Sequence, residues 1–475
     1  MFIGKTWQDL QSFSGRRQDF ILAAVNEYVA SEWYRDACRA ERYAGGDTDI
    51  RRNRKKMAMQ PVTYKDNNDV VRKTGELAAI ATNYVSNNMY GRLVQQRIQY
   101  LYQNGMALDK AQKAAFGADI DAQIERAAHF ATIHGETYLF WDLDKVRQIS
   151  AASADGSSGM FFLLDEMTGV PNMGIRFWRI ASDKPRYVQV YSAAGWTLYA
   201  EKDGELNMIE ERGYISTTRR DVLGATNVQR GYDKLPFVVF KANDASASTL
   251  THDVRSKIDL YDKILSDLGD NLERMEGIYW VIKNFGGDAR EARAMLAELE
   301  QLRTAVGHDD GTEAHPEAIE APYAAREFAL NLLERQIYKD FMALNMDEIT
   351  GGSLTNVAIN VAKANLDLAA NQLETQTFAA LYDLLAIIGK SELYADISKY
   401  KRQAIGNQLE NVEMVYNTGL RQDIPREKAL QLTGLFEADE IAQILKDMDA
   451  DDVAGLDNAE KLQQLLADKE GGWVR

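Results

Sequence analysis

The chain has 475 residues, which is enough for two to four domains or for one elaborated subunit with a large core. Its composition, 45% hydrophobic and 27% charged, is ordinary for a soluble globular protein, and no apolar run of 18 residues occurs, which excludes a transmembrane helix. The net charge of −16 argues against a protein that grips nucleic acid through its phosphates, but it permits a conduit through which DNA slides without sticking.

The single cysteine, Cys38, excludes an internal disulfide and fits a reducing cytoplasm. The stretch Met1–Trp7 lacks the basic-then-apolar layout of a signal peptide, so we expect the protein to stay where it is made.

Residues 1 to about 150 are predicted to be mainly helical, because apolar residues recur at helical spacing in Ile21–Trp33 and again in Leu77–Val85. A basic run lies between these stretches. It is most simply a solvated surface segment, and the alternative is a patch that contacts DNA or an acidic partner. Its members are Arg51, Arg52, Arg54, Lys55 and Lys56.

Residues from about 137 to 241 change character to short aromatic and β-branched runs, most of them separated by Gly, Asn, Asp or Pro. This pattern predicts a β-rich region of short strands. The runs are Thr137–Trp141, Met160–Leu164, Ile175–Trp178, Tyr187–Tyr191 and Phe237–Phe240.

A heptad stripe begins after Leu250 and predicts one straight helix of roughly 24 residues, about 36 Å long. Its apolar positions are Val254, Ile258, Tyr261, Leu265, Leu268, Leu272 and Met275. A short strand at 278–282, a short helix around Leu296 and Leu299, and an extended piece at 316–322 are predicted to follow.

A second long helix is predicted from Tyr323 to about Leu344, with Leu330, Leu333, Ile337 and Phe341 on one face. Gly351 and Gly352 interrupt the chain before a third helix, from about Asn356 to Gly389. Two long helices around a small insert suit a subunit that projects a narrow extension better than they suit a compact enzyme.

Motifs for catalysis are missing: there is no phosphate-binding G-x-x-x-x-G-K-[ST] and no G-x-S-x-G nucleophile elbow. His129 and His134 are five residues apart and would not share a helix face as a zinc-binding i, i+4 pair does. We therefore predict no enzymatic activity, no metal and no cofactor.

The segment Leu235–Asn243, which leads into Asp253–Asp267, resembles the portal (head-to-tail connector) family of long-tailed double-stranded DNA bacteriophages. In that family a Pro-led strand closing on an Asn precedes a helix with an Ile-Asp-x-Tyr core and a Ser-Asp pair. The segments Trp280–Gly286, Gly135–Leu139 and Ile424–Leu430 resemble further stretches of the same family.

The resemblance implies an α+β, mainly helical portal fold, assembled as a ring that usually has twelve subunits. It would divide the chain into wing, stem, clip and crown regions. The wing takes 1–249, the stem helices 250–275 and 323–344, the clip 276–322, the tunnel loop 345–355, a long wing helix 356–389, and the crown with acidic C-terminal helices 390–475.

The resemblance also implies three groups of functional residues. Stem packing would use the two apolar stripes given above, and the clip would contact the packaging motor or adaptor through Tyr279, Trp280, Ile282, Phe285, Leu296 and Leu299. The tunnel loop would reach the DNA channel through Asp347, Glu348, Ile349, Thr350, Gly351, Gly352 and Ser353.

We hypothesise that this loop, which has two acids and no base at its tip, acts sterically as a gasket or one-way gate; the simpler alternative is a plain helix connector. Family members commonly carry Ser-Gly-x-Ala-Leu-Lys after the loop. Here Thr355–Asn360 lacks the lysine, so a phosphate contact at that position is not expected.

The implied function is a portal at one capsid vertex of the virion, assembled in the host cytoplasm, that conducts double-stranded DNA during packaging and ejection and nucleates procapsid assembly. The implied partners are the terminase large subunit, a head-completion adaptor, the major capsid protein and the scaffold, and no membrane. Two alternatives stay open: another head-morphogenesis or scaffolding protein without a channel, and an enzyme of unknown chemistry.

Overall fold

The structure is a computed structural model. It describes residues 4–52, 60–65, 71–78, 83–103, 105–106, 108, 110–221, 224–275, 279–283, 313–317, 323–345, 363–390, 442–443 and 445–446. Among these residues, no helix combines the length and the apolar character needed to cross a membrane.

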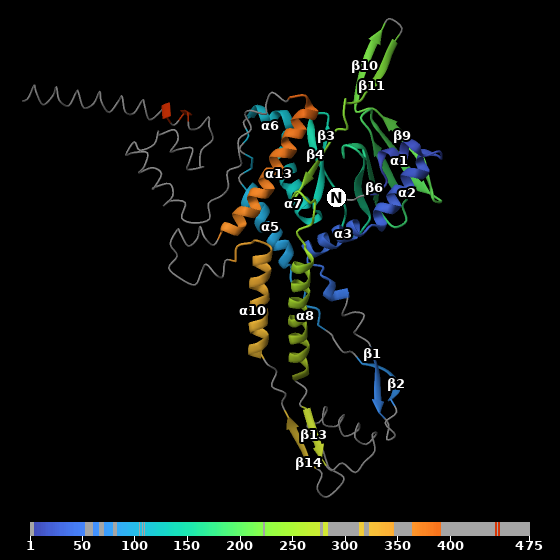
Figure 1. Ribbon diagram of the computed structural model, residues 1–475. Coiled ribbons are helices and arrows are strands. Elements are labelled where there is room, and N and C mark those ends of the chain that lie inside the picture. The colour runs from blue at the N-terminus through green and yellow to red at the C-terminus, as the bar shows by residue number, and fades with distance from the viewer. Residues whose placement is uncertain are drawn as a thin grey trace, which may run out of the picture.

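A five-stranded antiparallel sheet forms one half of the body, with the strands in chain order (Figure 1). Its strands are β5 (Ser158–Leu164), β6 (Pro171–Arg179), β7 (Arg186–Tyr191), β8 (Trp196–Lys202) and β9 (Glu205–Arg212). Helices α1 (Trp7–Ser12) and α2 (Arg17–Ala30) belong to the same half of the body, and α3 (Glu32–Ala44) packs with both halves. The fully buried Tyr28 of α2 stacks on Phe161 of β5 with ring centroids 4.6 Å apart, which ties the helical layer to the sheet.

A three-stranded sheet, ordered β12-β3-β4, forms the other half. Its strands are β12 (Phe237–Lys241), β3 (Glu136–Asp142) and β4 (Lys145–Ser150), and its helices are α5 (Met89–Tyr102), α6 (Lys110–Phe116), α7 (Ile120–His134) and α13 (Ala364–Ile388). Gly135 joins α7 to β3 with φ +98°, and a Cβ there would lie 2.3 Å from the Ser246 carbonyl oxygen. Only glycine fits both conditions.

Aromatic side chains fill the space between the two sheets. Phe140 stacks on Phe237 with centroids 4.7 Å apart, and Tyr138 meets Phe162 edge to face at 4.8 Å. The five aromatic and β-branched runs predicted from the sequence therefore all lie on strands of this packed body.

One prediction for the N-terminal region is wrong. The described parts of the range 77–85 are not helical: β1 (Gln60–Lys65) pairs antiparallel with β2 (Val71–Ala78), which contains 77 and 78, and 83–88 is irregular. Helical apolar spacing does not decide the structure of these described residues, because 77 and 78 pair in a hairpin and the amides of Asn83 and Val85 bond to a distant helix.

Two long helices, α8 (His252–Met275) and α10 (Tyr323–Asp340), run side by side away from the body (Figure 1), and we refer to this pair as the stem. Beyond them β13 (Tyr279–Lys283) pairs with β14 (Glu313–Glu317), and a further hairpin, β10 (Ile215–Asp221) with β11 (Gly224–Arg230), lies at the opposite end of the molecule.

The second stem helix is shorter than predicted: α10 ends at Asp340, not at Leu344. Met342 adopts a left-handed conformation, φ +56°, and the amide of Ala343 donates back to the carbonyl of Tyr338. This hydrogen-bond pattern terminates a helix and turns the chain. The predicted third helix is described only over 364–388, as α13.

Several predicted features lie outside the described residues. They are the whole tunnel-loop set Asp347–Ser353, the clip residues Phe285, Leu296 and Leu299, the basic residues Arg54, Lys55 and Lys56, and almost all of the acidic C-terminal region.

Candidate functional site: the stem helices and their surroundings

The stem stripe is buried at one end and exposed at the other. In the half next to the body, which we call the upper stem, Val254, Ile258 and Ile337 are at most 1% exposed, and Leu333 and Phe341 are also buried. The ion pair between Lys257 and Asp340 joins the two helices at the same level. The upper stem is therefore part of the main hydrophobic core.

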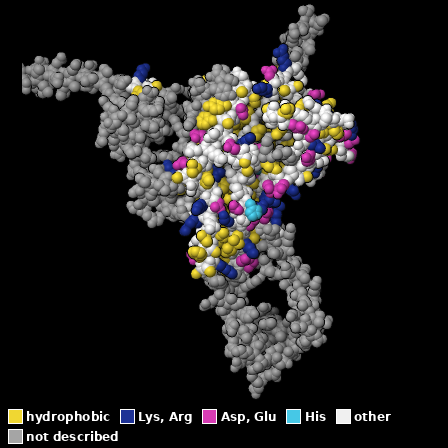
Figure 2. All heavy atoms as spheres, in the orientation of Figure 1, with side chains coloured by type: hydrophobic (Ala, Val, Ile, Leu, Met, Phe, Trp, Pro, Cys, Tyr) yellow, Lys and Arg dark blue, Asp and Glu magenta, His cyan; other side chains and the backbone are white. Residues whose placement is uncertain are grey.

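In the half farther from the body, the lower stem, the same helices leave apolar side chains uncovered. Tyr261, Leu265 and Leu268 are half-buried, and Leu272 is 52% exposed. On α10, Leu330 is half-buried, while Phe328 is 69% exposed. Figure 2 shows hydrophobic side chains gathered over this part of the molecule.

A polar ladder runs along α8 beside the apolar stripe. It consists of Asp262, Ser266 and Asp270, three buried residues spaced four apart. They accept hydrogen bonds from alternate backbone N–H groups of the chain before α5: Asn87 to Asp262 (3.1 Å), Val85 to Ser266 (2.9 Å) and Asn83 to Asp270 (2.8 Å).

The spacing of this ladder has a simple geometric basis. Four residues of α-helix rise about 6.0 Å, and two residues of extended chain span about 6.6 Å, so alternate amides meet successive turns of α8. The polar ladder therefore fixes the segment that joins the β1–β2 hairpin to α5 against the stem.

Burial raises the pKa of Asp262 to about 6, although the hydroxyl of Thr48 (2.7 Å) and the amide of Asn87 donate to its carboxylate and favour the charged form. The desolvation of the carboxylate thus outweighs its hydrogen bonds.

The described part of the predicted clip is the β13–β14 ladder. Tyr279, Trp280 and Ile282 lie on β13, opposite Glu317, Pro316 and Ala314 of β14.

Of the basic run, Arg51 and Arg52 are exposed, and Arg52 lies 3.4 Å from Asp47.

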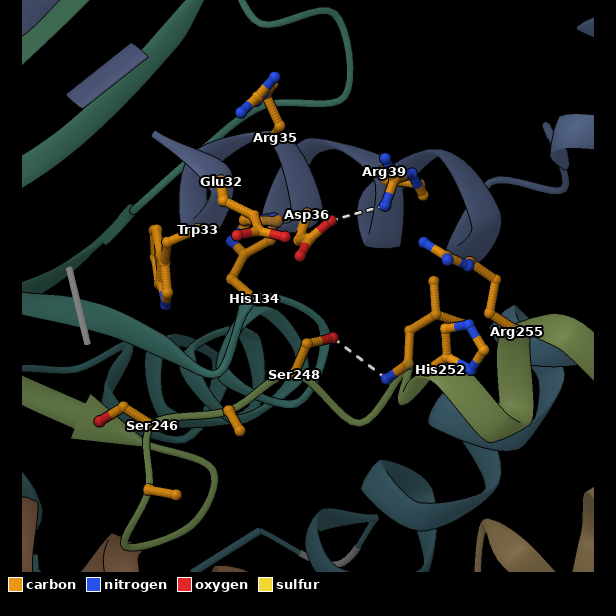
Figure 3. Close-up of a pocket in the computed structure, with 14 residues that line it drawn as sticks. Glu32, Trp33, Arg35, Asp36, Arg39, His134, Ser246, Ser248, His252 and Arg255 are labelled. Atoms are coloured by element: carbon orange, nitrogen blue, oxygen red, sulfur yellow. Dashed lines mark hydrogen bonds and ion pairs between the residues drawn. The ribbon is translucent and has the colours of Figure 1, made fainter. Parts of the chain in front are cut away.

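A cavity of about 740 Å³ lies where α3 meets the N-terminal end of α8 (Figure 3). Serines and histidines line it, but their hydrogen bonds lead elsewhere: Ser248 donates to the carbonyl of Ile133, and Nε2 of His134 pairs with Glu41 at 2.8 Å. These two residues therefore do not form the nucleophile–base pair that covalent catalysis requires.

The sequence interpretation missed the polar ladder, although the i, i+4, i+8 spacing of its acids and serine along the heptad helix was a visible signal. It also missed the contacts of α5 with the end of α10, for which no local pattern gives a signal.

Comparison with known proteins shows the family to which the chain belongs. A family model described as "Phage portal protein, SPP1 Gp6-like" matches residues 34–454. The portal protein of Clostridium phage phiCD119 is 28% identical over 198 residues, 39% of this chain and 43% of that protein. The portal protein of Bacillus phage SPP1 is 25% identical over 307 residues, 62% of this chain and 58% of that protein. The chain thus spans about half the length of the curated relatives it matches.

Among solved structures, a chain in the virion of a native gene transfer agent particle matches with a TM-score of 0.39 and 11% identity, covering 74% of this chain and 91% of that one. A chain in the neck of the native particle, computed with C12 symmetry, matches with a TM-score of 0.39 and 12% identity, covering 73% and 91%. The family match over most of the length confirms the resemblance found in the sequence, and the chain belongs to the SPP1 Gp6-like family of phage portal proteins.

Proposed function

We propose that this protein forms a ring, usually of twelve copies, at one vertex of a phage capsid, and that double-stranded DNA passes through the ring during packaging and ejection. Membership in the portal family supports this function. The observation that carries it is the stem, whose apolar stripe is buried within the chain in its upper half and half-buried or exposed in its lower half.

An uncovered stripe on a paired helix favours association with another copy. Head-to-tail contacts generate a ring when the rotation between neighbouring subunits closes after a whole number of copies. The interfaces of such obligate oligomers are usually apolar. Leu272 and Phe328 are the side chains that we expect to become buried when neighbouring stems meet.

The acidity of the chain suits a conduit. Lysine and arginine clusters would hold DNA by releasing counterions and would resist sliding, whereas a subunit with net charge −16 repels the duplex. Salt at physiological concentration screens this repulsion beyond about 8 Å. The repulsion therefore acts only on DNA that lies close to the wall of the channel.

The parts of the subunit would then have separate partners. The β13–β14 ladder belongs to the clip, which would meet the terminase large subunit and later the head-completion adaptor. The body would contact the major capsid protein and the scaffold, and the ring would nucleate procapsid assembly. Residues 345–355 would project toward the DNA.

The native mass of the purified protein, with electron micrographs of the same fraction, tests the proposal first. We expect particles of about twelve subunits with a central hole, because closed cyclic symmetry satisfies every head-to-tail contact. A closed dimer or trimer without a hole would overturn it and favour a scaffolding protein. A monomer would be retested with scaffold and capsid protein present, and failure to enter procapsids would then contradict the proposal.

A further inference from the structure

Helix α5 contacts the chain on both sides of residues 346–362. On the side where the chain leaves the stem, the side-chain amide of Gln96 makes a matched pair of hydrogen bonds with the backbone of Leu344. Its oxygen accepts from the Leu344 amide at 3.0 Å, and its nitrogen donates to the Leu344 carbonyl at 2.9 Å. Paired bonds of this kind fix both position and orientation.

Arg97, the next residue of α5, holds the same end of α10. Its guanidinium donates to the carbonyl of Phe341 and lies 4.3 Å from the centroid of the Phe341 ring. This carbonyl is at the C-terminal end of α10, where a helix is partially negative and attracts a cation.

The burial of Arg97 is costly. Burial lowers its pKa to about 10, and among the described residues no carboxylate forms an ion pair with it. Within the described part of the chain, one carbonyl and one aromatic ring compensate this buried cation, which is a poor way to gain stability because the desolvation of a charge is costly. The arrangement is better explained by the position that it imposes on the end of α10.

On the side where the chain returns, Tyr100 of α5 donates to the carboxylate of Asp367, in the first turn of α13, at 2.6 Å. The same tyrosine shares one small buried cluster with Leu344, before residues 346–362, and with Leu366 and Ala370, after them. A single turn of α5 thus touches both ends.

We propose that Gln96, Arg97 and Tyr100 form a clamp of positioning residues, which holds the end of α10 and the start of α13 in fixed places and so sets where residues 346–362 leave the body. This rests on the proposed function, in which that segment contains the DNA-facing loop. The clamp would be needed for holding packaged DNA and not for assembling the ring.

The chain offers a matched pair of variants to test the clamp. Tyr100→Phe removes the hydrogen bond to Asp367. Tyr102→Phe, two residues along the same helix, removes the hydrogen bond of equal length, 2.6 Å, to Thr377, which lies in the middle of α13. Both variants keep the ring of the side chain, and both lose one contact between α5 and α13.

Hydrogen exchange of the full-length protein gives the first readout. We expect Tyr100→Phe to speed amide exchange at 341–345 and 363–367 by about tenfold, the effect of one lost bond to a charged group on local opening. Tyr102→Phe should leave these amides unchanged. Equal exchange in the two variants would overturn the clamp.

DNA retention gives the second readout. Each variant is supplied to the phage that carries this gene, with its own copy removed, and DNA per filled head is measured beside the number of portal-containing procapsids. We expect normal procapsids with both variants and several-fold less retained DNA with Tyr100→Phe alone. Normal retention with Tyr100→Phe, or an equal loss with Tyr102→Phe, would overturn the proposal.

The two proposals fail in different ways. If the unaltered protein does not restore packaging at all, the portal function is wrong, whatever the exchange data show. If it restores packaging and the two variants behave alike, only the clamp is wrong. Gln96→Ala is the second clamp variant, should Tyr100→Phe fold poorly, and the same outcomes apply to it.

Discussion

The upper and lower stem are built from the same two helices and the same heptad pattern, yet they differ in what covers them. The upper stem packs into the core, where Ile258 and Ile337 are completely or almost completely buried. The lower stem leaves exposed both Leu272, which belongs to the stripe of α8, and Phe328, which lies on another face of α10. One continuous stripe on α8 therefore packs against the body at one end and is available for a neighbouring subunit at the other. The sequence pattern is the same at both ends, and only the burial of the side chains tells them apart.

The largest effect expected from this difference is on the stability of the single subunit. Ile258→Ala in the upper stem should lower the free energy of unfolding by about 2–5 kcal/mol, because it leaves a cavity in a packed core. Leu272→Ala in the lower stem should change it by less than about 0.5 kcal/mol. Denaturant unfolding of the dissociated subunit measures both, and similar losses would contradict the division of the stem.

For assembly of the ring we expect the lower stem to matter more than the upper stem. Phe328→Glu should weaken each contact between subunits by about 2 kcal/mol or more, since a charge would be buried where an aromatic anchor fits, and should shift the native mass away from the ring. The stability of the isolated subunit should stay within about 0.5 kcal/mol of the original. Glu327→Gln, at an exposed neighbouring position, is the control, and an intact ring with Phe328→Glu would place the interface elsewhere.

The polar ladder sharpens the comparison through pH. The folded-state pKa of Asp262, about 6, lies above the value of about 3.9 for an unfolded chain, so the folded protein binds this proton more tightly. The contribution of Asp262 to stability is therefore fully present below about pH 4 and is lost as the pH rises through about 6.

Asp262→Asn removes this titration while keeping the shape of the side chain and one acceptor for the amide of Asn87. Relative to the original protein, the variant should gain stability between about pH 4 and pH 6. Thermal unfolding of both proteins across this range measures the difference, and a difference that does not change with pH would refute the assignment.

Much of the body could be predicted from the sequence because its signals are local. Runs such as Met160–Leu164 and the 4-3 spacing from Val254 encode a strand and a helix within one short window. The segment 83–87 could not be predicted, since its amides bond to partners 175 to 187 residues away. The clamp is a contact of the same kind: Gln96 and Leu344 are 248 residues apart, and neither has a local partner pattern.

The smallest expected effect concerns the point where the upper stem ends. Met342 adopts the left-handed conformation that ends α10, and its Cβ strains the backbone in this conformation. Because Met342 is 45% exposed, the rest of its side chain makes few packing contacts. Met342→Gly should raise the free energy of unfolding by about 0.5–1 kcal/mol, because glycine adopts this conformation without strain. Met342→Ala keeps the Cβ and is the matched control. Equal gains in the two variants would show that the gain comes from removing the side chain and not from relieving backbone strain. A gain with glycine alone would show that the strained turn at Met342 lowers the stability of the protein, while the clamp holds the same turn in place.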